Sequence, residues 1–129
     1  MAALLATLVA RASATHAPDH RFLLIGYVTD AKGNPAARVS VVVTRVKTGL
    51  RHPTKTESDG LYLVIVHLHD EDEGELLRVA TGGVTAELRA RFDVRDTKTE
   101  RGTRVDFRGG RATEIRPLFA TTLRDYLAR

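Results

Sequence analysis

Short stretches of alternating apolar and polar residues dominate the chain. The clearest is Val84–Val94, where the residues follow a strict period of two and predict one long strand. Arg21–Thr29 and Arg38–Val46 are rich in β-branched and other apolar residues, which predicts two further strands. Leu61–His69 is apolar at both odd and even positions, so we expect a central strand that is covered on both faces.

Turn signals separate further short strands along the chain. The predicted turns contain Asp59-Gly60, Gly82-Gly83 and Gly109-Gly110. The remaining predicted strands are 54–57, 76–80, 103–108 and 112–116. Short strands about 8–12 residues apart, joined by such turns, predict an all-β fold. The expected architecture is an antiparallel β-sandwich over residues 21–116.

The pattern changes at Pro117, where the period becomes helical. Leucine, aromatic and threonine residues recur every three or four positions, and proline is well tolerated in a first helical turn. Residues 117–129 are therefore predicted to form a short C-terminal amphipathic helix. The sandwich core is expected to contain Leu24, Val28, Val39, Val41, Val43, Tyr62, Val64, Val66, Leu88, Ala90 and Phe92.

The first fourteen residues resemble an export signal. Ala2–Ala10 is apolar, and Ala12-Ser13-Ala14 matches the small-x-small pattern of a signal-peptidase site. No cation precedes Leu4, and the alternative is an ordinary amphipathic helix. The sequence thus predicts a signal peptide over 1–14, a flexible segment over 15–20 and a periplasmic or secreted protein. No apolar run reaches the ~18 residues of a transmembrane helix, so no membrane span is expected.

The order of the turn and strand signals resembles a known family. Gly26-x-Val28-x-Asp30-x-x-Gly33-x-Pro35 precedes the valine-rich strand, and Thr56-x-x-Asp59-Gly60-x-Tyr62 follows it. Over about residues 22–94 this resembles the carboxypeptidase regulatory-like domain. The resemblance implies a seven-stranded transthyretin-like, or prealbumin-like, sandwich. It also implies an accessory module without catalytic residues.

Charge is distributed unevenly along the chain. Residues 78–129 carry twelve cations and seven acids, and arginine accounts for sixteen of the twenty cations in the whole sequence. Arg89 and Arg91 share one face of the predicted long strand and are candidates for binding a partner's carboxylates or an anionic glycan. The alternative is a set of cross-strand charge pairs. Nucleic acid is not an expected partner, because no aromatic residues interleave with the cations.

Metal binding has one candidate pair of ligands. His67 and His69 are two residues apart and would project from the same face of a strand, where they could chelate Zn²⁺ or Cu²⁺ with a third ligand. Asp70 is the adjacent candidate. The others are Glu71, Asp72, His16, His20 and His52. The alternative is that the two histidines are polar groups at a strand end.

The acidic run that follows suggests a weaker candidate. Asp70–Glu75 contains five carboxylates, but its spacing departs from that of a calcium-binding EF-hand loop. Calcium is therefore less expected than zinc or copper, and the alternative is a solvated hairpin tip.

Catalytic motifs are missing from the sequence. There is no cysteine, no HExxH motif, no phosphate-binding loop and no serine in a nucleophile elbow. We expect no enzymatic activity and no cofactor. The leading hypothesis is an exported, non-catalytic binding or assembly module that presents a rigid sandwich to a protein or polysaccharide of the cell envelope. The alternative is a small periplasmic metal-binding protein that uses His67 and His69.

Overall fold

The computed structural model describes residues 17–129 of the chain. The predicted signal peptide lies outside the described residues, as do the first two residues of the predicted flexible segment. Pro18–His20 form a single 3-10 turn, η1, directly before the first strand. Within the described part, no helix is long and apolar enough to cross a membrane.

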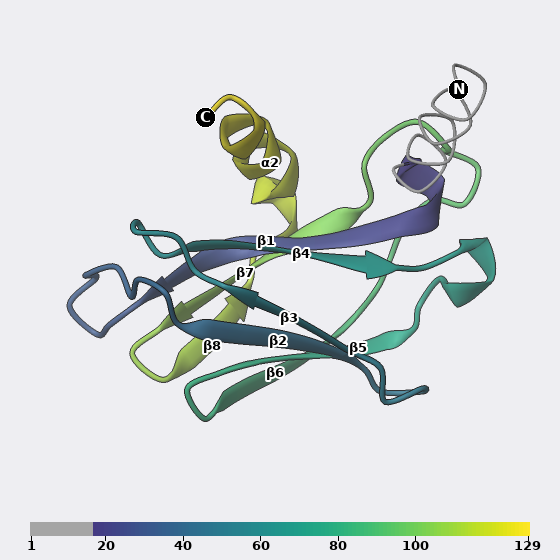
Figure 1. Ribbon diagram of the computed structural model, residues 1–129. Coiled ribbons are helices and arrows are strands. Elements are labelled where there is room, and N and C mark those ends of the chain that lie inside the picture. Colours follow the sequence, from purple (N-terminus) through teal and green to yellow (C-terminus); the bar gives the residue numbers. More distant parts are fainter. Residues whose placement is uncertain (1–16) are drawn as a thin grey trace, which may run out of the picture.

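Eight strands in residues 17–129 form two four-stranded sheets (Figure 1). The first sheet has the order β4-β1-β7-β8 and the second the order β3-β2-β5-β6. The strands are β1 Arg21–Thr29, β2 Ser40–Arg45, β3 Arg51–Lys55, β4 Leu61–His67, β5 Leu76–Thr81, β6 Val84–Arg89, β7 Gly102–Arg108 and β8 Arg111–Glu114. The predicted mostly-β fold is confirmed. The expected number of seven strands is wrong, because β8 adds an edge to the first sheet.

One strand pair departs from the antiparallel pattern. β1 pairs antiparallel with β4 on one side but parallel with β7 on the other, so the first sheet is mixed. The parallel ladder joins Leu24 to Thr103 and resumes at Val28 and Phe107. A parallel pair requires a crossover connection, and here the chain reaches β7 from β6 of the second sheet.

The central strand of the first sheet is β1. Its residues Phe22–Gly26 are all buried. The predicted central strand, Leu61–His69, is instead β4 at the edge of the sheet, and it ends at His67. Its double coverage has a different cause: Tyr62 faces the core between the sheets, while Leu61 packs with the C-terminal helix.

The predicted strand 84–94 is shorter than its alternation suggests. β6 ends at Arg89. Ala90 still pairs with the loop that precedes β5: its N–H donates to the Glu75 carbonyl at 2.9 Å, and its carbonyl accepts from the Gly74 N–H at 2.7 Å. The chain then crosses toward β7. The period of two persists because Ala90 and Phe92 still face the interior outside any strand.

The core between the sheets agrees closely with the prediction. Nine of the eleven predicted residues are buried, whereas Val39 and Phe92 are only partly covered. The further buried members are Phe22, Leu68, Leu77, Val79, Val105 and Phe107. Most of these additions come from β5 and β7.

A close approach of three strands explains two residues of the recognised pattern. Tyr62 lies opposite Gly26 in the β1–β4 register, and its hydroxyl donates a 2.5 Å hydrogen bond to the Val105 carbonyl of β7. A Cβ at Gly26 would overlap that same carbonyl. Only glycine at this position therefore allows β1 to lie so close to the Val105 carbonyl.

The C-terminal helix covers the outer face of the first sheet. η3 (Arg116–Leu118) leads into α2 (Phe119–Leu127), so the predicted helix is confirmed with its proline in the turn before it. Phe119 and Leu123 pack on Leu23 and Ile25 of β1, forming a second, smaller apolar cluster. Gly102 of β7 makes room for the Phe119 ring, since a Cβ there would overlap it.

Candidate functional site

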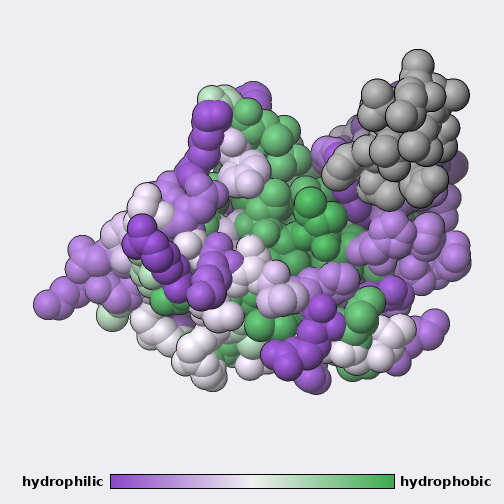
Figure 2. All heavy atoms as spheres, viewed as in Figure 1, coloured by the Kyte–Doolittle hydropathy of each residue, from purple (hydrophilic) through white to green (hydrophobic). Residues whose placement is uncertain are grey.

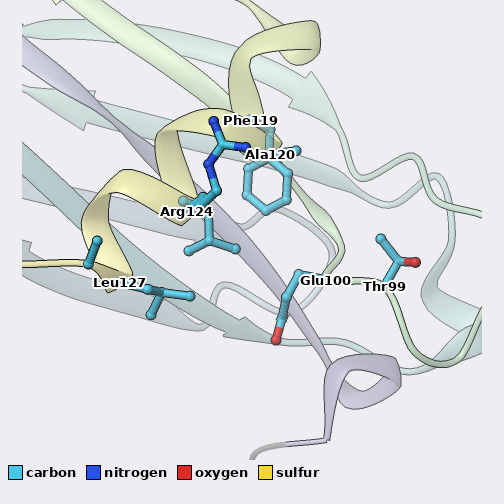
Figure 3. Close-up of a pocket in the computed structure, with 8 residues that line it drawn as sticks. Thr99, Glu100, Phe119, Ala120, Arg124 and Leu127 are labelled. Carbon is cyan, nitrogen blue, oxygen red and sulfur yellow. The ribbon is translucent and has the colours of Figure 1, made fainter.

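An open groove of about 490 Å³ runs beside α2. Its lining combines one side of the helix with the loop that leads into β7 (Figure 3). The lining residues are Thr99, Glu100, Phe119, Ala120, Leu123, Arg124, Leu127 and Ala128. We call this feature the α2 groove. Apart from Thr99, Glu100 and Arg124, its residues are apolar.

Apolar surface continues outward from the groove. Leu127 is 70% exposed and Leu118 is 41% exposed, although both belong to the C-terminal segment that packs on the sheet. Ile65 on β4 is 49% exposed on the same outer face. Figure 2 shows this apolar surface in the hollow beside α2. A contiguous apolar patch of this kind is typical of an interaction site.

The acidic group in the groove is already paired. Glu100 accepts a 3.1 Å hydrogen bond from Arg21 Nε through Oε2, and a second from Arg21 Nη2 through Oε1. Both side chains are largely covered. The bidentate pair with Arg21 balances the charge of the Glu100 carboxylate. The groove is therefore mainly apolar although Glu100 lines it.

A polar network holds α2 in place on the sheet. Arg104 of β7 donates to Thr122 of α2 at 3.1 Å and to Asp106 at 2.8 and 3.0 Å. Asp106 also accepts the Tyr27 backbone N–H at 3.0 Å, at the point where the parallel ladder is interrupted. The hydrogen bond to Asp106 raises the pKa of Arg104, which keeps the guanidinium charged. The groove therefore has a fixed wall.

Arg129, which follows α2, is also held by ion pairs. Arg129 forms ion pairs with Glu57, at 3.0 Å, and with Asp59 in the turn between β3 and β4. Hydrogen bonding to Asp59 raises the pKa of Arg129. These pairs are exposed, so they fix the direction of the helix end more than they add stability.

The predicted arginine row on the second sheet is engaged in local pairs. Arg89 donates to the Gly74 carbonyl at 3.3 Å, and Arg91 lies 3.6 Å from Glu73. On the same sheet, Arg78 and Glu87 form a cross-strand ion pair at 2.9 Å. Only Arg78 and Glu87 form the cross-strand pair that the alternative predicts, whereas Arg89 and Arg91 contact the loop before β5, and a partner-binding role for them stays a prediction.

The histidine pair gains a neighbour that lies far away in sequence. The His67 and His69 ring centres are 5.0 Å apart, and the His20 ring of η1 lies 5.1 Å from that of His69. We call these three residues the histidine cluster. Among residues 17–129, no group of three or more His, Asp or Glu side chains lies in a position to hold a metal ion.

Asp70 points to a different partner. Its Oδ1 accepts a 2.9 Å hydrogen bond from Arg101, whose side chain is only 3% exposed. The Arg101 guanidinium also lies over the Phe92 ring, at 4.3 Å from the ring centre. Asp70 thus balances a buried cation.

Three further carboxylates of the acidic run also lie beside arginine side chains. Arg45 binds Glu75 at 2.6 Å and lies 3.6 Å from Asp72. Hydrogen bonding to Glu75 raises the pKa of Arg45. With Asp70 on Arg101 and Glu73 near Arg91, four carboxylates of the run face arginines. This pairing favours a structural loop over a calcium site.

His52 lies on β3 of the second sheet. It is opposite the buried Val43 in the β2–β3 register, so it faces the interior, and its buried Nε2 atom has no hydrogen-bond partner among the described residues. Burial lowers the pKa of His52, and electrostatic interaction with Arg45 and then with His67 lowers it further. The imidazole is therefore held in its neutral form.

Sequence reasoning missed the α2 groove. A signal for the groove was present, because Leu127 shares the helical spacing of Phe119 and Leu123, which are buried on the sheet, and yet stays exposed. His20 was among the candidate partners of the histidine pair, and the structure brings it to His69. Its place beside His69 follows from the register that sets Arg21 opposite His67.

No family model matches the chain, and no curated protein matches it. Solved structures resemble it only at low identity. The dioxygenase domain of a dioxygenase–carbohydrate-binding fusion from the cellulolytic bacterium Streptomyces sp. SirexAA-E is 17% identical, with a TM-score of 0.48 over 73% of this chain and 82% of that one. An (S)-allantoin synthase is 14% identical, with a TM-score of 0.48 over 78% of this chain and 45% of that one.

A third neighbour is catechol 1,2-dioxygenase from Acinetobacter sp. ADP1, at 14% identity and a TM-score of 0.43, covering 70% of this chain and 45% of that one. The chain thus spans less than half the length of the second and third neighbours. These neighbours are enzymes, which contradicts the sequence-based prediction that this chain is not one, and that prediction is withdrawn. The activities named are those of the neighbours, and none is carried over to this chain.

Proposed function

We propose that this chain is an exported binding module that holds an apolar segment of a partner protein in the α2 groove. The turn and strand pattern supports a transthyretin-like sandwich related to the carboxypeptidase regulatory-like domain. The apolar stretch Ala2–Ala10, followed by Ala12-Ser13-Ala14, supports export to the periplasm or the exterior.

One observation carries the binding proposal. Leu127 is 70% exposed beside a groove whose wall is fixed by the Arg104–Asp106–Thr122 network. Removing apolar area from water contributes about 25 cal/mol per Å², so a partner that covers this surface gains binding energy from it. A rigid wall adds to that gain, because little ordering is needed on binding.

The lining favours a protein over a polysaccharide. Sugar recognition depends on many polar donors and acceptors, whereas the groove offers mainly alkyl and phenyl surface. Its carboxylate, Glu100, is occupied by Arg21. Apolar side chains of a helix or an extended segment match this surface, with Arg124 at the rim available to an acidic residue of the partner.

A photo-crosslinking experiment tests the groove. A benzophenone amino acid replaces Leu127 in the full-length chain produced in its native host, and the matched control carries it at the exposed Thr121, which does not line the groove. We expect one discrete protein adduct from position 127 that excess unlabelled wild-type chain suppresses and excess Leu127→Lys chain does not. Equal adducts from both positions would show that the groove has no special role.

Export has its own test. Mass spectrometry of the envelope or secreted fraction should find Thr15 as the first residue of the mature chain. A chain that keeps Met1 or Ala2 and stays in the cytoplasm would contradict export. That result would leave the groove experiment unaffected.

A further inference from the structure

One end of the sandwich contains an open apolar pocket of about 550 Å³, which we call the end pocket. It lies where β1 and β7 of the first sheet end and where the second sheet turns from β5 into β6. Figure 1 shows the loop after β1, the β5–β6 turn and the β7–β8 turn at this same end of the molecule. We propose that the end pocket binds a small amphiphilic carboxylate, with its apolar body between the sheets and its carboxylate on Arg108.

The end pocket opens directly onto the core between the sheets. Val28 and Phe107 line it from the first sheet, and both are buried members of that core. Val39 and Val84 line it from the side of the second sheet, and they are only partly covered. The core is therefore incomplete at this end, and a ligand that covers these side chains is stabilised by removing apolar area from water.

The spacing of the two sheets limits the shape of the ligand. Two packed sheets lie about 10 Å apart. An α-helix with its side chains is about 10–12 Å across, so it does not fit between them. An alkyl chain or a single flat ring is narrower and does fit. The volume of about 550 Å³ also falls within the range of about 300–1,000 Å³ that is typical of small-molecule sites.

The rim of the end pocket leaves room for a ligand. Gly82 and Gly110 line it, and each belongs to a turn made of two consecutive glycines. A Cβ placed on either glycine would meet no atom of a more distant residue within 4 Å. The two turns therefore leave open space beside the pocket.

Arg108 supplies a positive charge at this rim. Its side chain is exposed, and within residues 17–129 it forms no ion pair. Its hydrogen bond to the Ala31 carbonyl is 3.4 Å long, which is outside the usual range for a strong bond. A guanidinium can donate two parallel hydrogen bonds to one carboxylate. Arg108 is therefore available to hold the carboxylate of a ligand whose apolar body lies in the pocket.

The acidic residue of the lining does not oppose an anion in the same way. Asp30 Oδ1 accepts the backbone N–H groups of Lys32 and Asn34, each at 2.9 Å, and Oδ2 accepts the Asn34 side-chain amide at 3.2 Å. These N–H donors balance the charge of the Asp30 carboxylate within its own turn. The unpaired charge of Arg108 therefore determines which sign of ligand the pocket prefers.

Titration of the full-length chain with decanoate, followed by ¹H–¹⁵N NMR, tests the proposal. Decanol and decyltrimethylammonium are the uncharged and cationic comparisons. We expect one decanoate to bind per chain, more tightly than decanol, with decyltrimethylammonium the weakest of the three. The amide signals that move should include those of Gly82 and Gly110, whereas those of Ala120 and Leu127 in the α2 groove should stay in place.

Two variants separate the role of the charge from that of the apolar lining. Arg108→Gln should weaken decanoate binding at least about fivefold and change decanol binding by less than about twofold. Val84→Trp places a larger side chain at the pocket and should abolish the binding of both compounds. In the matched control, Arg111→Gln removes the exposed arginine opposite Arg108 in the β7–β8 register, which does not line the pocket. It should change decanoate binding by less than about twofold.

Three results would overturn the proposal: no binding of decanoate, signal changes confined to the α2 groove, or equal weakening by Arg108→Gln and Arg111→Gln. The last would show a general attraction of anions to this end of the chain. Both arginine variants should keep the melting temperature of the wild type, so they and the NMR signals decide the question even if Val84→Trp fails to fold. None of these outcomes contradicts binding of a protein segment at the α2 groove, because no residue lines both features.

Discussion

The two faces of the first sheet are closed by different partners. The inner face packs against a second four-stranded sheet, and Phe22, Leu24 and Val66 are completely buried there. The outer face packs against α2, which covers Ile25 fully but leaves Ile65 49% exposed. One strand, β1, supplies side chains to both faces.

The difference follows from simple lengths. β1 has nine residues and spans about 30 Å at 3.3 Å per residue. α2 also has nine residues, but a helix rises 1.5 Å per residue, so it spans about 14 Å. A single short helix cannot cover a sheet face that a second sheet covers completely. The uncovered apolar surface beside α2 is a consequence of this mismatch.

Leucine truncation on each face should give the largest contrast. Leu24→Ala opens a cavity in the inner core, where we expect a loss of about 3–4 kcal/mol in the free energy of unfolding. Leu123→Ala on the outer face should cost only about 2 kcal/mol, because the groove lets neighbouring atoms and water adjust. Urea denaturation measures both. A larger loss for Leu123→Ala would show that α2, rather than the second sheet, dominates the stability.

Removing one tyrosine hydroxyl from each face should give the second-largest difference in the free energy of unfolding. Tyr62→Phe leaves the buried Val105 carbonyl without its 2.5 Å hydrogen bond, at a cost of about 1–2 kcal/mol. Burial raises the pKa of Tyr62, so the hydroxyl remains a donor across the usual pH range. The matched change on the outer face, Tyr126→Phe, should stay within about 0.5 kcal/mol in the same denaturation experiment. Equal effects would contradict the special role of this bond.

The second sheet, which packs against the inner face, contains a titratable group on β3. Burial lowers the pKa of His52 in the folded protein, so the unfolded chain takes up a proton first. The stabilisation is complete above the ordinary value of about 6.5 and is lost as the pH falls from there through the folded-state pKa. His52→Gln should flatten this part of a plot of melting temperature against pH. An unchanged pH dependence would indicate that other groups control it.

The smallest effect on stability is expected at the groove. Leu127 is already 70% exposed, so Leu127→Lys should change the free energy of unfolding by less than about 0.5 kcal/mol. The same change should abolish competition in the crosslinking experiment. A variant that unfolds more easily, by 1 kcal/mol or more in urea, would show that Leu127 supports the outer face and is not a free contact.

The sequence predicted what local patterns determine. The Gly33 turn has the expected positive φ of 89°, and Gly60 in the Asp59-Gly60 turn has a φ of 84°. The core positions of β2 and β4 follow from period-two alternation, which assigns a face as soon as a strand is long enough. The predicted helix followed from its period in the same way.

Long-range placement was beyond the sequence. Nothing local shows that β7 joins β1 in parallel, so Leu61–His69 was expected at the centre of the sheet instead of at its edge. The partner of Asp70 could not be inferred either, because Arg101 is buried by loops that alternation does not describe. The same limit applies to His20, whose neighbour His69 is set by strand register.

The parallel pairing of β1 and β7 has a consequence for how the chain folds. Tyr27 and Asp106, which meet there, are 79 residues apart in sequence. Contacts between residues so far apart in the sequence slow folding, because a long loop must close before they form. Until Gly102–Arg108 has emerged from the ribosome, β1 has an unpaired edge that can pair with another chain. A chain truncated before β7 should therefore aggregate, and the full-length chain should depend on being kept unfolded until its last quarter is available.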